Sequence, residues 1–273
     1  MNKIAPWVLA SSLLGLSCAA QAIDLTAETL LDINIGLSSD YRVGGFSLDQ
    51  NESPALLTSA TLVHKISGLY AGVFTANVDM GTDSNREWDY YVGIARPITE
   101  NTRFSLSYVR YEYPGDSWIN FGEWVGTVGY RHATLGLKYS NSLQNPPARA
   151  AAAAQVDQLI GAGILPASAA VTPRDKHRTI GWAEYDFYLP WQTKLNLRYG
   201  HTWTPDEQAW LSEDGSYRSG YSDWQIALSK RLYGLEWKAA YIDTDLSRAE
   251  CTNNFGDGGN CHATVVFSAS KHF

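Results

Sequence analysis

Apolar and polar residues alternate one by one along most of this chain. In KLNLRYGHTW, Leu195, Leu197 and Tyr199 share one face, whereas Lys194 and Arg198 share the other. The same period of two recurs in EWDYYVGI, TLGLKYS, DWQIAL and LEWKAAY. Such alternation is typical of β-strands that have one apolar and one polar face. It predicts an all-β chain of about twelve strands, at residues 29–38, 55–66, 69–79, 87–96, 102–113, 121–131, 134–141, 179–189, 192–203, 222–231, 234–243 and 262–273.

The connections between these strands alternate strictly between long and short. The short connections fall at 67–68, 97–101, 132–133, 190–191 and 232–233. The long connections fall at 39–54, 80–86, 114–120, 142–178, 204–221 and 244–261. An up-and-down antiparallel barrel in an outer membrane has this asymmetry, with short periplasmic turns and long extracellular loops. We therefore predict a transmembrane β-barrel.

The polar face of the predicted strands carries charges of both signs. In hydrocarbon every backbone group must be paired, so a spanning sheet must close on itself. An ionised group that faces lipid costs about 2–4 kcal/mol at the midplane, so the charged face must point into the lumen. A soluble barrel would turn its apolar face inward instead. The predicted lumen residues are Glu87, Asp89, Glu123, Lys138, Glu184, Asp186, Lys194, Arg198, Asp223, Glu236 and Lys238.

Both ends of the chain suit export to an outer membrane. Residues 1–22 combine Lys3, an apolar stretch and the small-residue ending AQA, as a cleavable signal peptide does. The barrel would then occupy residues 23–273. Cys18 leaves a lipoprotein open, although the residues before it make a poor lipobox. The chain ends in the half-apolar strand VVFSASKHF, and Phe273 resembles the terminal aromatic signal that outer-membrane assembly machinery reads.

The composition narrows the range of partners. A net charge of −7 argues against non-specific binding of nucleic acid and favours a mild cation preference in a channel. Ten Trp and sixteen Tyr suit two membrane–water interfaces, and an ordinary aromatic-rich core is the alternative. The predicted belts are Tyr70, Phe104, Tyr130, Phe187, Trp191 and Tyr233 beside short turns, and Trp88, Tyr113, Trp118, Trp124, Trp203, Trp224 and Tyr241 toward long loops.

Two cysteines lie beyond the predicted signal peptide, Cys251 and Cys261. An exported chain meets an oxidising compartment, so we expect a disulfide across the Gly-rich loop TNNFGDGGN. Metal binding is the alternative, but two cysteines without a second pair are a weak metal signal. We predict no metal and no cofactor.

The spacing of the residues reveals no catalytic constellation. The six His are scattered, and GYSDW lacks the second Gly of a nucleophile elbow. Glu87/Asp89 and Glu184/Asp186 share a face as i, i+2 pairs; they could do acid–base work, but we favour a lumen wall. The DTD sequence at 243–245 could bind Ca²⁺, and we favour a solvated acidic loop. The sequence therefore predicts a protein that is not an enzyme.

Two segments each have two interpretations. In SDYRVGG, the rim residues Asp40, Tyr41 and Arg42 could bind solute. Alternatively, Asp40 and Arg42 form a structural ion pair and the two glycines supply the turn, which we favour. The Ala-rich insertion within 142–178 is either an external loop with one short helix, which we favour, or a helix that plugs the lumen.

The chain resembles the TorF-type porins, a family of outer-membrane β-barrels of Gram-negative bacteria. The residues that carry the resemblance are LSSDYRVGGFSLDQNESPAL (37–56), GLYAGVFTANVD (68–79), YVRYEYPG (108–115), FGEWVGTVGY (121–130), LKYS (137–140), DTDL (243–246) and VVFSASKHF (265–273). SDYRVGG is the most specific piece. The resemblance implies a barrel and a channel, but no catalytic residue and no known solute. The Ala-rich insertion and the cysteine pair depart from the family pattern.

These observations together predict a monomeric outer-membrane barrel, surrounded by lipid, that forms a narrow porin-like channel for passive diffusion of small solutes. Twelve strands lie between the filled interior of an eight-stranded barrel and the aqueous pore of a sixteen-stranded one. One alternative is a barrel without transport, such as a lipid-modifying enzyme or a structural anchor. The other is a soluble periplasmic β-barrel that binds an apolar ligand.

Overall fold

A computed structural model describes residues 22–50, 54–81, 83–140, 154, 157–164, 177–204, 210–255 and 257–273. Long antiparallel strands make up most of this part of the chain. They are β2 (Thr29–Ser38), β5 (Ala55–His64), β6 (Leu69–Asn77), β7 (Arg86–Pro97), β8 (Thr102–Glu112), β9 (Phe121–Tyr130), β10 (Ala133–Ser140), β11 (Arg178–Leu189), β12 (Thr193–Trp203), β15 (Gly220–Leu232), β16 (Leu235–Thr244) and β17 (Thr264–His272). A short strand, β1 (Ile23–Asp24), pairs with Leu30 and Leu31 near the start of β2.

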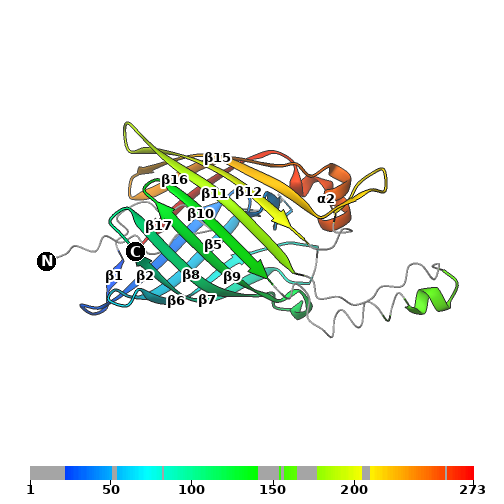
Figure 1. Ribbon diagram of the computed structural model, residues 1–273, viewed down its shortest axis with the longest axis horizontal. Coiled ribbons are helices and arrows are strands. Elements are labelled where there is room, and N and C mark those ends of the chain that lie inside the picture. Colours follow the sequence, from blue (N-terminus) through cyan, green and yellow to red (C-terminus); the bar gives the residue numbers. More distant parts are fainter. Residues whose placement is uncertain are drawn as a thin grey trace.

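The sheet closes on itself. The long strands pair in sequence order, and β2 pairs with β5 on one side and with β17 on the other. The last residue lengthens this seam, because the Phe273 N–H donates to the Ile33 carbonyl at 2.9 Å. The closed, twelve-stranded antiparallel barrel confirms the architecture predicted from the alternation (Figure 1). Predicted strand ends differ from the observed ones by no more than two residues.

The two ends of the barrel differ as predicted. The short turns and the C-terminus lie at one end, and α2 (Arg248–Phe255) lies at the other (Figure 1). The short turns use left-handed backbone, with φ of 73° at Gly68, 56° at Tyr233 and 76° at Gly234. Residues 233–234 form a two-residue hairpin loop, which needs such angles to follow the right-handed twist of the strands that it joins.

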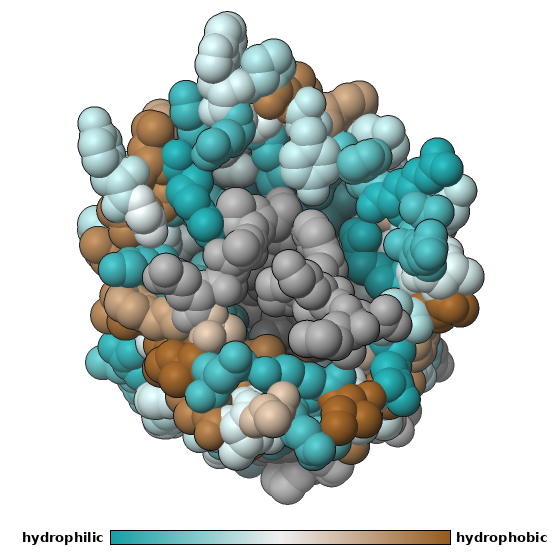
Figure 2. Space-filling model, turned by 90° about the vertical axis from the view of Figure 1, so that its left-hand side faces the viewer, coloured by the Kyte–Doolittle hydropathy of each residue, from teal (hydrophilic) through white to brown (hydrophobic). Residues whose placement is uncertain are grey.

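The apolar faces of the strands point outward. Leu135, Phe267 and Val92 are 64%, 62% and 56% exposed, and similar residues recur on all of the long strands. Seen from the short-turn end, apolar side chains gather around the outer surface of the barrel (Figure 2). An apolar exterior of this extent on a closed barrel is the surface of a membrane-spanning protein. It contradicts the soluble barrel, which needs its apolar face inside.

The predicted aromatic belts are only partly correct. Tyr130, Trp191 and Tyr233 are exposed beside short turns. The prediction is wrong for Tyr70 and Tyr113, which are buried and face the interior. Their hydroxyl groups find polar partners there: the Tyr70 hydroxyl lies 3.1 Å from Ser105 Oγ, and the Tyr113 hydroxyl donates to Glu87 at 2.6 Å. The position of an aromatic residue near a strand end did not show whether its side chain faces the lipid or the interior.

The interior is packed on one side. Tyr41, Leu57, Phe74 and Tyr111 belong to an apolar cluster along β5 to β8, beneath the hairpin β3 (Arg42–Val43) and β4 (Phe46–Ser47). A smaller cluster of Val63, Tyr70 and Ala95 lies toward the short-turn end of the same strands. The opposite wall, from β10 to β17, borders a cavity. The space inside this part of the barrel therefore lies along the β10–β17 wall.

A cap of short elements covers the long-loop end. It comprises η1 (Ser117–Ile119), β13 (Trp210–Leu211), β14 (Tyr217–Arg218), α2 and η3 (Gly258–Cys261). Alternation cannot predict such short elements, since two residues carry no period. A disulfide joins Cys251 of α2 to Cys261 of η3, with Cα atoms 5.9 Å apart.

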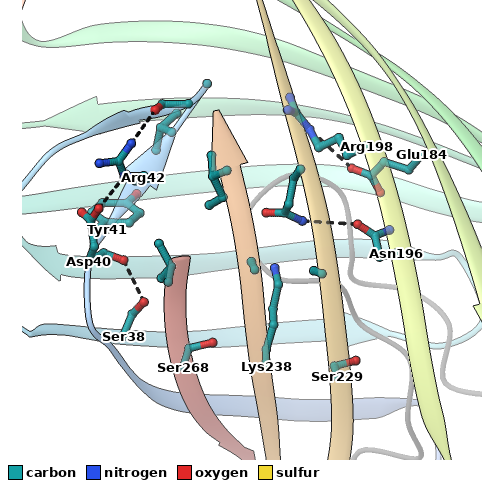
Figure 3. A pocket seen from close by; sticks show the side chains of 18 of the residues that line it. Ser38, Asp40, Tyr41, Arg42, Glu184, Asn196, Arg198, Ser229, Lys238 and Ser268 are labelled. Carbon is teal, nitrogen blue, oxygen red and sulfur yellow. Dashed lines mark hydrogen bonds and ion pairs between the residues drawn. The ribbon is translucent and has the colours of Figure 1, made fainter. Parts of the chain in front are cut away.

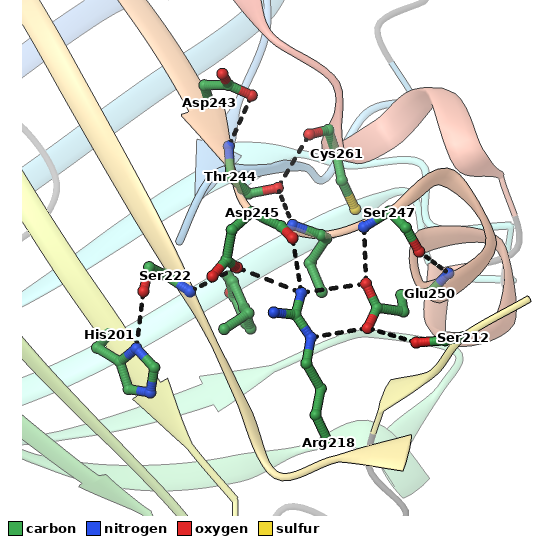
Figure 4. A network of polar contacts seen from close by, with 12 residues as sticks. His201, Ser212, Arg218, Ser222, Asp243, Thr244, Asp245, Ser247, Glu250 and Cys261 are labelled. Atoms are coloured by element: carbon green, nitrogen blue, oxygen red, sulfur yellow. Dashed lines mark hydrogen bonds and ion pairs between the residues drawn. The ribbon is translucent and has the colours of Figure 1, made fainter. Parts of the chain in front are cut away.

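Arg218 links the two hairpin loops of this cap (Figure 4). It forms a 2.7 Å ion pair with Glu250, and its Nη2 donates to the Asp245 carbonyl at 2.8 Å. Burial tends to raise the pKa of the Glu250 carboxyl, but hydrogen bonds from Ser247 and Ser212 and the nearby Arg218 charge bring that pKa below its usual range. The carboxylate is therefore ionised and holds α2 against β13 and β14.

Two sequence predictions fall largely outside the described residues. The predicted signal peptide covers residues 1–22, of which only Ala22 is described. Of the Ala-rich insertion, residues 157–161 are helical with mostly exposed side chains, and this helix is drawn beyond the long-loop end (Figure 1). Within the described ranges, no helix is both long and apolar enough to cross a membrane.

Candidate functional site

The eleven predicted lumen residues all lie on the face opposite the exposed apolar one, and the structure sorts them into two groups. The first is an acidic cluster on the packed side. Glu87 and Glu123 are each 1% exposed. Glu87 accepts hydrogen bonds from the hydroxyl groups of Tyr41, at 2.8 Å, and Tyr113, at 2.6 Å. These two hydrogen bonds fix Glu87 at the base of the hairpin.

Glu123 is the anchor of a charged row across three strands. Arg178 Nη2 on β11 donates to Glu123 Oε1 on β9 at 2.7 Å. Lys138 on β10 lies between them in the sheet, with its Nζ 3.7 Å from Glu123 Oε2. Removing one partner of a buried pair is far costlier than replacing both, so we expect these three residues to be constrained together.

Asp89 differs from its two neighbours in the cluster. It is 1% exposed, and neither carboxylate oxygen has a hydrogen-bond partner among the described residues. An ionised carboxyl without a partner is costly to bury, so Asp89 adds no contact that fixes the cluster.

The second group lies on β11 to β16 beside a cavity of about 170 Å³, which Glu184, Lys194, Arg198, Glu236 and Lys238 border. Arg198 on β12 forms a 2.6 Å ion pair with Asp223 on β15 and lies 3.8 Å from Glu184 on β11. Asn196 donates to Asp186 at 2.8 Å. These cross-strand contacts hold the polar groups of the wall in fixed positions, as a selective lining requires.

The hairpin β3–β4 borders the same cavity, on the left in Figure 3. Asp40 and Arg42 form an ion pair, and Arg42 Nη1 also donates to the His262 carbonyl at 2.9 Å. The Gly44 carbonyl accepts a 2.9 Å hydrogen bond from the Tyr221 hydroxyl on β15. The predicted ion pair between Asp40 and Arg42 is therefore formed, and both residues border the cavity.

Comparisons with known proteins give sequence and fold relatives. Residues 24–147 match the profile of a family described as a bacterial protein of unknown function (Gcw_chp). No curated protein matches the chain. The matched segment runs from β1 to β10, which includes the acidic cluster but not most of the cavity wall.

Among solved structures the chain is similar to three porins. The NanC porin has a TM-score of 0.47 at 10% identity, with 88% of this chain and 97% of that chain covered. The KdgM porin has a TM-score of 0.43 at 6% identity, with 90% of this chain and 98% of that chain covered. OccAB3 of Acinetobacter baumannii has a TM-score of 0.39 at 13% identity, with 92% of this chain and 66% of that chain covered. Likenesses this distant transfer neither a solute nor the role of any residue.

No enzyme-like grouping emerges on the described part of the chain. His201 Nδ1 lies 2.9 Å from Ser222 Oγ, but the nearby Asp245 carboxylate accepts from the Ser222 backbone N–H at 2.8 Å rather than from the imidazole (Figure 4). The pair therefore lacks the acid that orients a catalytic His. Nor do three His, Cys, Asp or Glu side chains converge as metal ligands within the described ranges.

Two interior residues were missed from the sequence. Arg178 lies one position before the predicted start of its strand, yet it shares the parity of Glu184 and Asp186, which could have revealed it. Trp182 also faces inward, where its ring covers Gly136 on β10: a Cβ at Gly136 would lie 2.0 Å from that ring. Trp182 shares its parity with Glu184 and Asp186, and together with the Gly opposite its large ring this was a usable signal.

Proposed function

We propose that this protein is an outer-membrane channel of the TorF-type porin kind, which lets small solutes diffuse passively along the β10–β17 wall. One observation carries the proposal: a closed barrel with an apolar exterior encloses a cavity bordered by charged side chains of both signs. A barrel that served only as an anchor has no need for a polar cavity beside a packed half. The channel is not an enzyme and uses no cofactor.

The surroundings of the barrel belong to the same proposal. A signal peptide ending at residue 22 would direct export, assembly machinery would read Phe273, and the barrel would work as a monomer in outer-membrane lipid. The exposed apolar band supports the contact with lipid, because it includes residues of all of the long strands.

Planar bilayer recording tests the channel directly. The detergent-refolded protein, shown to be a folded barrel by heat-modifiable gel migration, is added to a bilayer in KCl. Discrete, long-lived conductance steps are expected, smaller than those of a sixteen-stranded porin because one half of the interior is filled. Folded protein that gives no steps would refute the channel, and turnover of a lipid substrate by the same sample would favour a lipid-modifying enzyme instead.

A further inference from the structure

The cavity wall is basic although the protein is acidic. Among the described residues, the carboxylates that border the cavity are Asp40, Glu184 and Glu236. The cations that border it outnumber them and are Arg42, Lys138, Lys194, Arg198 and Lys238. The acidic cluster of Glu87, Asp89 and Glu123 is absent from this lining, because it is buried on the packed side.

The cavity carboxylates already face cations. Asp40 is paired with Arg42, and Glu184 lies 3.8 Å from Arg198. Glu236 stands directly across from Arg231 in the register of β15 and β16. Beside the lining, Asp223 pairs with Arg198, Asp186 with Lys194 and Glu123 with Lys138, so Lys238 is the cavity cation that has no ion pair in the described part of the chain.

Lys238 therefore differs from the other cations of the cavity wall. In the described part of the chain it has no hydrogen bond or ion pair, whereas Lys194 lies 3.8 Å from Asp186 and Lys138 lies 3.7 Å from Glu123. Lys238 projects from β16 into the cavity between Ser229 and Ser268 (Figure 3). The carboxylates of Glu184 and Glu236 act on this ammonium only at longer range, so it keeps the capacity to pair with an anion from solution.

The strand register builds a cradle around this ammonium. Lys194, Ser229, Lys238 and Ser268 stand side by side on four consecutive strands, β12, β15, β16 and β17. Neighbouring strands lie about 4.8 Å apart, so the two lysines flank the Ser229 hydroxyl within reach of one small group. Two positions further along β15 and β16, Ala227 and Ala240 stand opposite each other on the same face. Their small side chains leave space beside the lysines.

We propose that Lys238, Lys194 and Ser229 form an anion-binding subsite in the lumen, which takes a carboxylate or phosphate group of a small solute. The inference rests on the proposed channel function and reverses the cation preference suggested by the overall charge. At about 170 Å³ the cavity is smaller than typical ligand pockets, so it holds one acidic substituent of a passing solute rather than a whole large ligand.

Three proteins test the subsite: wild type, Lys238→Gln and the control Lys230→Gln. Lys230 lies on β15 opposite the exposed Trp237, so the control removes the same charge from the outer face of the wall. In a KCl gradient, the reversal potential of wild type and control should show anion preference. Lys238→Gln should lower the anion-to-cation permeability ratio by at least about threefold and weaken block by inorganic phosphate similarly.

A second readout separates failure of the subsite from failure of the channel. Phosphorus NMR of inorganic phosphate with the detergent-solubilised barrel should show line broadening in wild type and control, and much less in Lys238→Gln. Silent bilayers with this Lys238-dependent broadening would refute the channel and keep the subsite. Cation preference in wild type, or equal behaviour of the two variants in both assays, would overturn the subsite. Heat-modifiable migration confirms that each variant is folded.

Discussion

Single carboxylates in this protein owe their properties to where the hairpin buries them. Asp49 follows β4 in the external loop and is 0% exposed. The Ser47 hydroxyl donates to Asp40 and lies 2.8 Å from Asp49 as well, so the two carboxyl groups share one small site. Burial, and then the hydrogen bond with Asp40, raise the pKa of the Asp49 carboxyl to about 6.

We predict that the hairpin is held more firmly at pH 5 than at pH 7.5. A raised pKa in the folded state means that protonation favours the folded hairpin, so its stabilisation is complete below about pH 4 and is lost as the pH rises through about 6. The Tyr41 N–H donates to Asp49 Oδ2 at 3.1 Å. Its amide resonance in nitrogen-labelled protein should therefore titrate with a midpoint of about 6.

Asp49→Asn should abolish that titration, since the amide mimics the protonated acid. Asp214→Asn is the matched control: Asp214 lies exposed in another external loop, where hydrogen bonds from Ser216 lower the pKa of its carboxyl. The control should keep the wild-type midpoint. A Tyr41 midpoint near the ordinary Asp value of about 4 would contradict the assignment.

Residue parity in the strands was predictable, and contacts were not. Glu87, Lys194 and Lys238 could be assigned to the lumen because the period of two fixes the face of every residue once one face is known to meet lipid. The same parity does not show that Glu87 is buried beneath two tyrosines while Lys238 stands in the cavity. That difference depends on where the hairpin folds, a long-range choice that no local pattern records.

Long strands could be predicted from the sequence, and the short elements could not. The long strands were predictable because eight or more alternating residues give a clear period, and their closure follows from the demand for backbone pairing in lipid. The hairpin of β3 and β4 was not, because its strands have two residues each. Its turn was still visible in Gly44 and Gly45, which have φ of 59° and 88°.

The cap at the long-loop end should depend on its disulfide. Replacing Cys251 and Cys261 together by Ser removes a cross-link worth about 2–4 kcal/mol for a short loop. We expect faster protease cleavage within residues 244–261, with unchanged heat-modifiable migration because no barrel strand is involved. Electrophoresis of timed digests would measure the difference.

A milder variant of the cap provides the comparison. Glu250→Gln keeps the disulfide and can still accept from Ser212, but it loses the charge that pairs with Arg218. Its cleavage should fall between wild type and the double Ser variant. A barrel that no longer migrates as a folded species after either change would show that the cap supports the strands, contrary to this prediction.

The whole molecule is organised around its seam. Phe273 exchanges backbone hydrogen bonds with Ile33, and Lys271 Nζ lies 4.6 Å from the centre of the Phe273 ring. The outward Val265 and Phe267 continue the apolar exterior across the closure. The last residue therefore contributes both to pairing and to the surface at the short-turn end.

Deleting Phe273 should impair insertion more than it alters the lumen. The deletion removes two backbone hydrogen bonds and an aromatic side chain at the membrane interface, while the cavity residues stay in place. The yield of heat-modifiable barrel in outer-membrane fractions should fall several-fold, and the single-channel conductance of the barrels that form should match wild type. Normal yield would count against the prediction, and Phe273→Tyr should restore much of the loss.

The seam between β17 and β2 also determines where the barrel opens first. β17 and β2 share five paired positions, whereas β2 and β5 share ten. Backbone hydrogen bonds of Phe273 with Ile33 and of Ser39 with Phe267 extend the junction with β17, which is still shorter than the junction with β5. When heat loosens the wall, β2 should therefore separate from β17 before it separates from β5, and hydrogen exchange should begin along β17. The junction between β17 and β2 is thus the place where we expect the barrel wall to open sideways, and a lateral passage between the lumen and the lipid would form there.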